Sequence, residues 1–404
     1  MKGKSYFFSL IFLLSTINTA FASGFQLLEM ATPSTATAGV GQAAYANDAS
    51  TAFLNPAGMS LLGTSQMLVG TQLFFPDIRF AQSVANTIPG GNGEKNNLLL
   101  PGGGIYFVSN LSERLSAGIS LASPYGGMVD YGDAYAGRYL AQKAELIFLD
   151  LTPVVSYKIN ALLSVGGGFS VQYTTLHESI ALPLPGFLDG QIILKVSDFA
   201  PGFNLGLLFT PLPTTRLGLA FRSQIKHTLT GNTYFNRLSF TPTSSAAINT
   251  PNSLIASGYH ELTERLALVG EVGWTNWQEF ENTVVKISGF TSTTPRNWKN
   301  AYRFGLGGNF KVTPKIKLMS GISYDNSPND ISNRLPDFPL DRQVRYAMGA
   351  LYTNSSQTQF GFQYEFVDYG NAKMFEPGSQ GIFSGELKKN HGQFISLTMN
   401  AHLD

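Results

Sequence analysis

Four apolar residues close to the N-terminus could bind a hydrophobic guest, and they are Phe25, Leu27, Leu28 and Met30. A pocket for an alkyl or aromatic molecule needs an apolar wall with few polar groups to fix orientation. Phenylalanine and methionine side chains can also repack around guests of different shape. We therefore expect these four residues to close an apolar ligand pocket.

Three cations could meet the head group of such a guest if that head group is a carboxylate. They are Arg138, Arg296 and Lys299. A carboxylate that enters a low-dielectric site needs a cation or several hydrogen-bond donors. The alternative interpretation is that these side chains form salt bridges at the rim or in the lumen of the fold.

Other chemistry is poorly represented in this chain. There are no cysteines, and the five histidines show neither metal-ligand spacing nor a Ser/His constellation. We expect no enzyme activity, no metal and no cofactor. The net charge is +1 and only 13% of the residues are charged, so the sequence gives no sign of a basic surface that would bind nucleic acid.

The first 22 residues have the organisation of an export signal. Lys2 and Lys4 precede an apolar run from Tyr6 to Ile17, and Ala20-Phe21-Ala22 places small residues at the cleavage site. We predict a signal peptide over 1–22 and a mature chain that starts at Ser23.

The rest of the chain is dominated by alternation with a period of two. In the segment from Gln359, Phe360, Phe362, Tyr364 and Phe366 lie on one face and polar or small residues on the other. Similar segments recur along 63–404, separated alternately by short turns and by long polar stretches such as 231–251, 281–297 and 370–389. This pattern predicts an all-β fold, a transmembrane antiparallel β-barrel of about 14 strands. Trp274, Trp277 and Trp298 are expected to belong to its aromatic interface girdle.

Residues 23–62 do not alternate and contain few charged residues. Pro56 suits the first position of a helical turn capped by Asn55. A 14-stranded barrel has a lumen that needs a filler, so we predict a small N-terminal helical hatch that plugs it. Asn55, Pro56 and Ala57 either gate passage or fix a turn against the wall.

Several blocks of this sequence resemble the FadL/TodX family of outer-membrane transporters for long-chain fatty acids and hydrophobic compounds. The blocks are Ser23 to Leu27, Asp48 to Phe53, Asn55 to Met59, Ser123 to Gly126, Gly137 to Tyr139, Trp274 to Trp277, Trp298 to Phe304 and Asp325 to Pro328. The resemblance implies capture of a guest among the outer loops, then a pocket near the N-terminus. It further implies movement of the N-terminus and sideways exit beside a kink in the third strand.

These observations predict a Gram-negative outer-membrane protein that passes a long-chain fatty acid or another hydrophobic small molecule by passive diffusion. The same fold could instead carry uncharged aromatic hydrocarbons, or serve as a surface-exposed barrel in adhesion or structure. The expected partners are outer-membrane lipid, lipopolysaccharide and the barrel-assembly machinery, with a monomer as the functional state.

Overall fold

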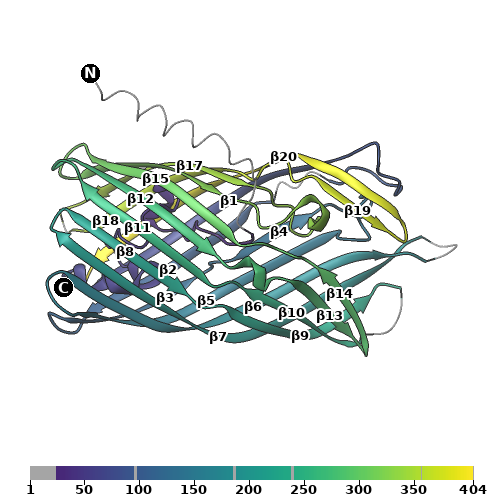
Figure 1. Ribbon diagram of the computed structural model, residues 1–404, viewed down its shortest axis with the longest axis horizontal. Helices are drawn as coiled ribbons and strands as arrows, with labels where there is room; N and C mark the ends of the chain where they lie inside the picture. The colour runs from purple at the N-terminus through teal and green to yellow at the C-terminus, as the bar shows by residue number, and fades with distance from the viewer. Residues whose placement is uncertain (1–23, 95–97, 185–187, 238–240, 356, 404) are drawn as a thin grey trace, which may run out of the picture.

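The computed structural model describes residues 24–94, 98–184, 188–237, 241–355 and 357–403. The predicted signal peptide, 1–22, and the predicted mature start at Ser23 lie outside the described residues. Antiparallel strands dominate the described chain and close into one barrel (Figure 1). No helix among the described residues has the length and apolar character needed to cross a membrane.

The wall of the barrel has fourteen strand positions in the described part of the chain. Nine positions are single strands: β1 (Gln66–Gln82), β2 (Leu100–Asn110), β5 (Lys143–Lys158), β6 (Leu163–Leu182), β7 (Gly190–Leu212), β16 (Ile316–Asp325), β17 (Gln343–Thr353), β18 (Gln359–Asp368) and β20 (Gly381–His402). The pairing of β20 with β1 closes the sheet on itself.

Five positions are each divided into two strands. They are β3 (Leu115–Ala122) with β4 (Gly126–Asp130), β8 (Thr215–Arg222) with β9 (Ile225–Phe235), β10 (Thr243–Thr250) with β11 (Ser253–Glu261), β12 (Leu266–Thr275) with β13 (Asn282–Ile287), and β14 (Phe290–Pro295) with β15 (Ala301–Lys311). A further strand, β19 (Met374–Gly378), forms a hairpin with the start of β20. The predicted transmembrane barrel of about 14 strands is confirmed.

The alternating pattern puts opposite environments on the two faces of each strand. Along β5, Ile147, Leu149 and Leu151 are exposed on the outer face, whereas Phe148 and Asp150 are buried on the inner face. Apolar side chains that face outward can meet lipid, while the inner face can hold polar groups.

Three stretches expected to be loops contain strands instead. β10 lies within 231–251, the hairpin of β13 and β14 lies within 281–297, and β19 with the start of β20 lies within 370–389. The expectation was wrong because β10 and β14 are rich in Ser and Thr, and β13 and β19, with six and five residues, are too short for a clear hydrophobic alternation.

The N-terminal segment, defined here as residues 24–62, lies inside the barrel (Figure 1, purple). Its short helices are η1 (Pro33–Thr37), α2 (Thr51–Leu54) and η2 (Pro56–Leu61), and two more, η3 (Trp277–Glu279) and η4 (Ile331–Asn333), occur between wall strands. Asn55 caps η2 and Pro56 occupies its first turn, as predicted.

Polar side chains of the wall hold the backbone of this N-terminal segment. The carboxylate of Glu271 accepts hydrogen bonds from the N–H groups of Gly41 and Gln42, both at 2.9 Å. The hydroxyl of Ser323 donates to the carbonyl of Ala38 at 3.0 Å. Short turns without a core of their own therefore become stable through buried hydrogen bonds to the barrel.

Candidate functional site

The third wall position is broken between β3 and β4, and the hydrogen-bonded wall is interrupted there. Among the described residues, β4 pairs with β5 alone, whereas β3 pairs with both β2 and β5. On the other side of the interruption, Leu100–Gly104 of β2 pair only with β1. Backbone pairing between β2 and β4 is thus missing from the described wall.

The first described residues of the chain pair with this break. Gln26 forms an antiparallel bridge with Tyr125. The N–H of Leu27 donates to the carbonyl of Pro124 at 2.9 Å, and the N–H of Gly126 donates to the carbonyl of Phe25 at 3.0 Å. Residues 25–27 therefore satisfy backbone groups that a broken strand would otherwise leave unpaired.

The side chain of Phe25 is the centre of an aromatic cluster and is only 3% exposed. Its ring centroid lies between 4.8 and 6.1 Å from six others, those of Tyr125, Phe148, Trp277, Phe280, Trp298 and Phe338. The neighbouring Gly24 packs so closely that a Cβ there would lie 2.8 Å from the Trp277 ring. Close packing on all sides fixes the N-terminus in this position.

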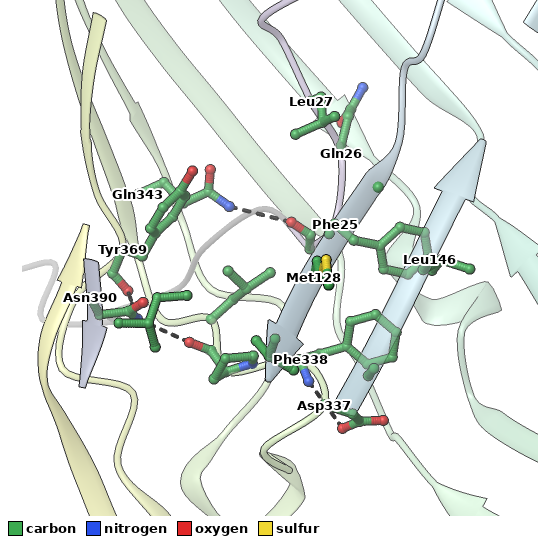
Figure 2. A pocket seen from close by; sticks show the side chains of 18 of the residues that line it. Phe25, Gln26, Leu27, Met128, Leu146, Asp337, Phe338, Gln343, Tyr369 and Asn390 are labelled. Carbon is green, nitrogen blue, oxygen red and sulfur yellow. Dashed lines mark hydrogen bonds between the residues drawn. The ribbon is translucent and has the colours of Figure 1, made fainter. Parts of the chain in front are cut away.

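A cavity of about 100 Å³ adjoins Phe25 and the break in the wall (Figure 2). It is lined mainly by apolar side chains: Leu27, Phe74, Ile78, Met128, Val129, Leu146, Leu176, Ile248, Phe338 and Leu340. β1, β4, β5, β6, β10 and the stretch before β17 supply these residues together with the N-terminal segment. An apolar lining with few polar groups suits an apolar guest.

Two arginines reach the cavity, and both are engaged by carboxylates. The guanidinium of Arg296 donates to both oxygens of Asp337, at 2.9 and 2.5 Å, and its Nε donates to the hydroxyl of Thr283 at 2.9 Å. Burial alone would lower the pKa of Arg296, but Asp337 more than offsets this and the pKa lies above its ordinary value.

Arg345 is the hub of a second buried network. It contacts Glu29 at 2.7 Å and Glu365 at 3.4 Å, and it is also paired with Asp325. Burial disfavours the charged form of Glu29, yet the Arg345 guanidinium outweighs this and holds the pKa of Glu29 below its ordinary value. Glu29 thus anchors the N-terminal segment electrostatically, 316 residues away from its partner in the sequence.

A polar layer separates the aromatic cluster from the deeper apolar contacts of the N-terminal segment. Inner-face residues along β5 run from Phe148 in the aromatic cluster through Asp150 and Thr152 to Val154, which packs with Phe53. At the level of Asp150, the layer also contains Gln172, His227 and Arg222. An apolar guest would have to cross buried charges to move further down the lumen.

The structure brings three of the predicted ligand-binding residues to the cavity: Phe25, Leu27 and Arg296. Leu28 is buried beside Gly39, and Met30 packs with Phe53 in a different cluster. Arg138 pairs with Asp189 at 2.8 Å, and Lys299 pairs with Asp330 at 2.6 Å, and neither lines the cavity. For these two cations the salt-bridge alternative describes the observed contacts.

Asn55, Pro56 and Ala57 lie against the wall, away from the cavity. The Asn55 amide donates to the carbonyls of Ala43 at 2.6 Å and Leu207 at 3.1 Å, and its oxygen accepts from the N–H of Ala57 at 3.1 Å. Gly166 and Gly206 provide the space, since a Cβ on either would collide with this turn. The three residues therefore fasten the N-terminal segment to β6 and β7.

Two tryptophans assigned to the interface girdle are instead buried. Trp277 is 0% and Trp298 3% exposed, and both pack on Phe25, so that prediction was wrong for them. The breaks after β12 and before β15 turn both rings inward. The sequence reasoning also missed Glu178, Asp337, Phe338 and Arg345. The alternation along β17 indicates that Arg345 faces inward, but no local pattern indicates how deeply its side chain is buried.

The family model described as "Outer membrane protein transport protein (OMPP1/FadL/TodX)" matches residues 13–402. The long-chain fatty acid transport protein of Escherichia coli is 25% identical, covering 82% of this chain and 85% of its own. A FadL homologue of Pseudomonas aeruginosa has the same fold, with a TM-score of 0.87 and 21% identity over 95% of this chain and 100% of its own. The Ralstonia pickettii toluene transporter TbuX gives a TM-score of 0.72 at 17% identity, over 94% of this chain and 100% of its own.

The family model spans nearly the whole chain, and its members are transporters rather than enzymes. This chain belongs to the OMPP1/FadL/TodX family of outer-membrane transport proteins.

Proposed function

We propose that this protein passes hydrophobic small molecules from outside the cell into the outer membrane by passive diffusion. The N-terminal residues withdraw from the broken strand, and the guest leaves sideways between β2 and β4. One observation carries the proposal: residues 25–27 line the apolar cavity and also pair with the strand at the interruption in the wall. A single movement of that segment would vacate both.

The order of layers inside the barrel supports a sideways exit. Below Phe148 an apolar guest meets Asp150, Gln172, Arg222 and His227, and desolvating such groups without replacing their hydrogen bonds is costly. At the interrupted wall beside Met128 the guest meets no such desolvation cost, because lipid lies outside the wall. The lower-energy route for the guest is through the wall.

The driving force needs no coupled energy source. Transfer of an alkyl chain from water into an apolar phase is favourable by about 0.8 kcal/mol per methylene. A guest with ten methylenes thus gains about 8 kcal/mol on reaching the bilayer. The protein only has to remove the barrier that the polar outer surface of the membrane presents.

In this mechanism residues 23–62 act as a hatch with a fixed part and a movable end. Asn55, Pro56 and Ala57 belong to the fixed part, since hydrogen bonds of Asn55 and Ala57 join the segment to β7 and β5. Phe25, Leu27 and Leu28 belong to the movable end, with Glu29 and Met30 at the boundary. Relatives are named for long-chain fatty acids and for toluene, and hydrophobic small molecules of this kind are the proposed substrate class.

A reversible cross-link tests the movement directly. The chain contains no cysteine, and the non-hydrogen-bonded pair Gln26 and Tyr125 has the short Cα separation that a disulfide requires. In cells that lack their own transporter of this type, the Q26C/Y125C variant should take up labelled oleate or toluene only when reduced. The two single-cysteine variants serve as controls, and uptake that continues in the oxidised variant would refute the hatch movement.

A further inference from the structure

We infer that the cavity beside Phe25 selects a guest whose polar end donates a hydrogen bond, a hydroxyl or an amine, and disfavours a carboxylate. Glu178 is the residue that accepts this bond. The inference rests on the proposed function, because it names the head group that the same pocket prefers.

The two guanidinium groups at the cavity are not available to a carboxylate guest without loss of an existing ion pair. Arg296 holds Asp337 with two parallel hydrogen bonds. Arg345 is shared among Glu29, Asp325 and Glu365. A carboxylate would have to compete with partners that are already buried and well oriented.

Carboxyl groups already surround both guanidinium groups at the cavity. Glu29, Glu178 and Asp337 line it together with Arg296 and Arg345. Asp325 and Glu365 are further partners of Arg345. A carboxylate guest would therefore add a further acceptor to a low-dielectric site whose cations are already engaged, whereas a donor would meet acceptors there.

Glu178 faces the cavity from β6, in line with the inward side chains of Gln172, Thr174 and Leu176. Its neighbours on the adjoining strands are Ala144 and Leu194, which offer no side-chain donor. Within the described residues no hydrogen bond or ion pair reaches its carboxyl group, although Arg296 and Asp337 exert an electrostatic influence on it.

A carboxyl group that faces a mainly apolar cavity, with no hydrogen bond from the described residues, gains most from a guest that brings its own donor. A hydrogen bond to a charged group is worth more than one between neutral groups, and an unmet acceptor in a buried site is costly. The hydrocarbon part of the guest would then lie along Leu146, Leu176 and Phe338. Glu178 thereby determines the preferred head group while the apolar lining holds the chain.

Three guests with the same twelve-carbon chain separate the head groups: dodecan-1-ol, dodecylamine and dodecanoate. Binding to the detergent-purified full-length mature protein at pH 8 can be followed by tryptophan fluorescence, because Trp277 and Trp298 pack against Phe25 beside the cavity. The alcohol and the amine should bind at least about tenfold more tightly than dodecanoate, the effect of one hydrogen bond to a charged group. In the E178Q variant the amine should lose about tenfold and dodecanoate should gain.

The matched control is E145Q, since Glu145 belongs to the adjoining strand β5, contacts Lys143 and does not line the cavity. It should leave all three affinities unchanged. Equal or tighter binding of dodecanoate by the wild-type protein, or equal effects of E178Q on all three guests, would overturn this inference and leave the proposed function intact. Failure of all three guests to bind would overturn both.

Discussion

The most informative single substitution is Phe25→Ala. It removes the aromatic packing that holds residues 24–27 in place and changes no residue of the barrel wall. Phe25 is 3% exposed and its ring contacts six other aromatic rings. Truncation of a buried phenylalanine to alanine costs about 3–5 kcal/mol. If that cost falls on the seated state alone, the ratio of withdrawn to seated molecules rises by about two to three and a half powers of ten.

Amide hydrogen exchange measures this ratio at the contact itself. The N–H groups of Leu27 and Gly126 are protected only while residues 25–27 are paired with the broken strand, so both should exchange faster in the variant by the same two to about three and a half powers of ten. Uptake of a hydrophobic guest should rise as well. The matched control is Phe53→Ala, a buried aromatic of the same N-terminal segment that packs with Met30 and Met59. Unchanged protection of Leu27 and Gly126 in Phe25→Ala would refute the reasoning, as would equal acceleration in Phe53→Ala.

Three further predictions concern the contacts that hold the segment in place. Asn55→Ala should lower the free energy of local unfolding of residues 43–57 by about 1–3 kcal/mol, since the carbonyls of Ala43 and Leu207 lose their donor. Limited proteolysis should then cut this stretch. The control Thr64→Ala, at the rim, should leave the stretch protected. Arg345→Met should lower the free energy of unfolding by about 3–5 kcal/mol because three carboxylates lose their cation, and thermal unfolding in detergent should show the loss. A simultaneous Glu29→Gln change should recover part of it. The pKa of Glu29 is held below its ordinary value of 4.5, so the stabilising effect of its ion pair is complete above pH 4.5 and disappears as the pH falls through the lowered pKa. The amide-exchange protection of Leu27 in the wild type should fall over that acidic range. Protection that does not change with pH there would contradict the role of the Glu29 ion pair.

The barrel could be predicted from the sequence because its physical cause is local. A strand between lipid and a polar lumen must alternate, and segments such as Gln359–Asp368 do so without interruption. Other wall strands, such as β10 and β14, are rich in Ser and Thr and gave no such signal.

The site was predictable only in part, for a related reason. Phe25 and Leu27 stand out because apolar residues near a mature N-terminus have no wall strand to belong to, and both reach the cavity. The partners of Arg296 and Arg345 come from strands and connections that the closure of the barrel brings together, such as Asp337 and Glu29. The breaks in the wall decide whether a tryptophan faces lipid or lumen, and they leave no clear periodic signature.

The sequence separation of the contacts between the N-terminal segment and the wall has a consequence for the order of assembly. Residues 41 and 42 bond to Glu271, 230 and 229 positions later, and Glu29 bonds to Arg345 after 316 positions. Contacts of such range form late in folding, since the intervening chain must first be ordered. We therefore expect the N-terminal segment to be seated after the wall has closed, so that each newly inserted barrel passes through a stage in which its lumen is unobstructed.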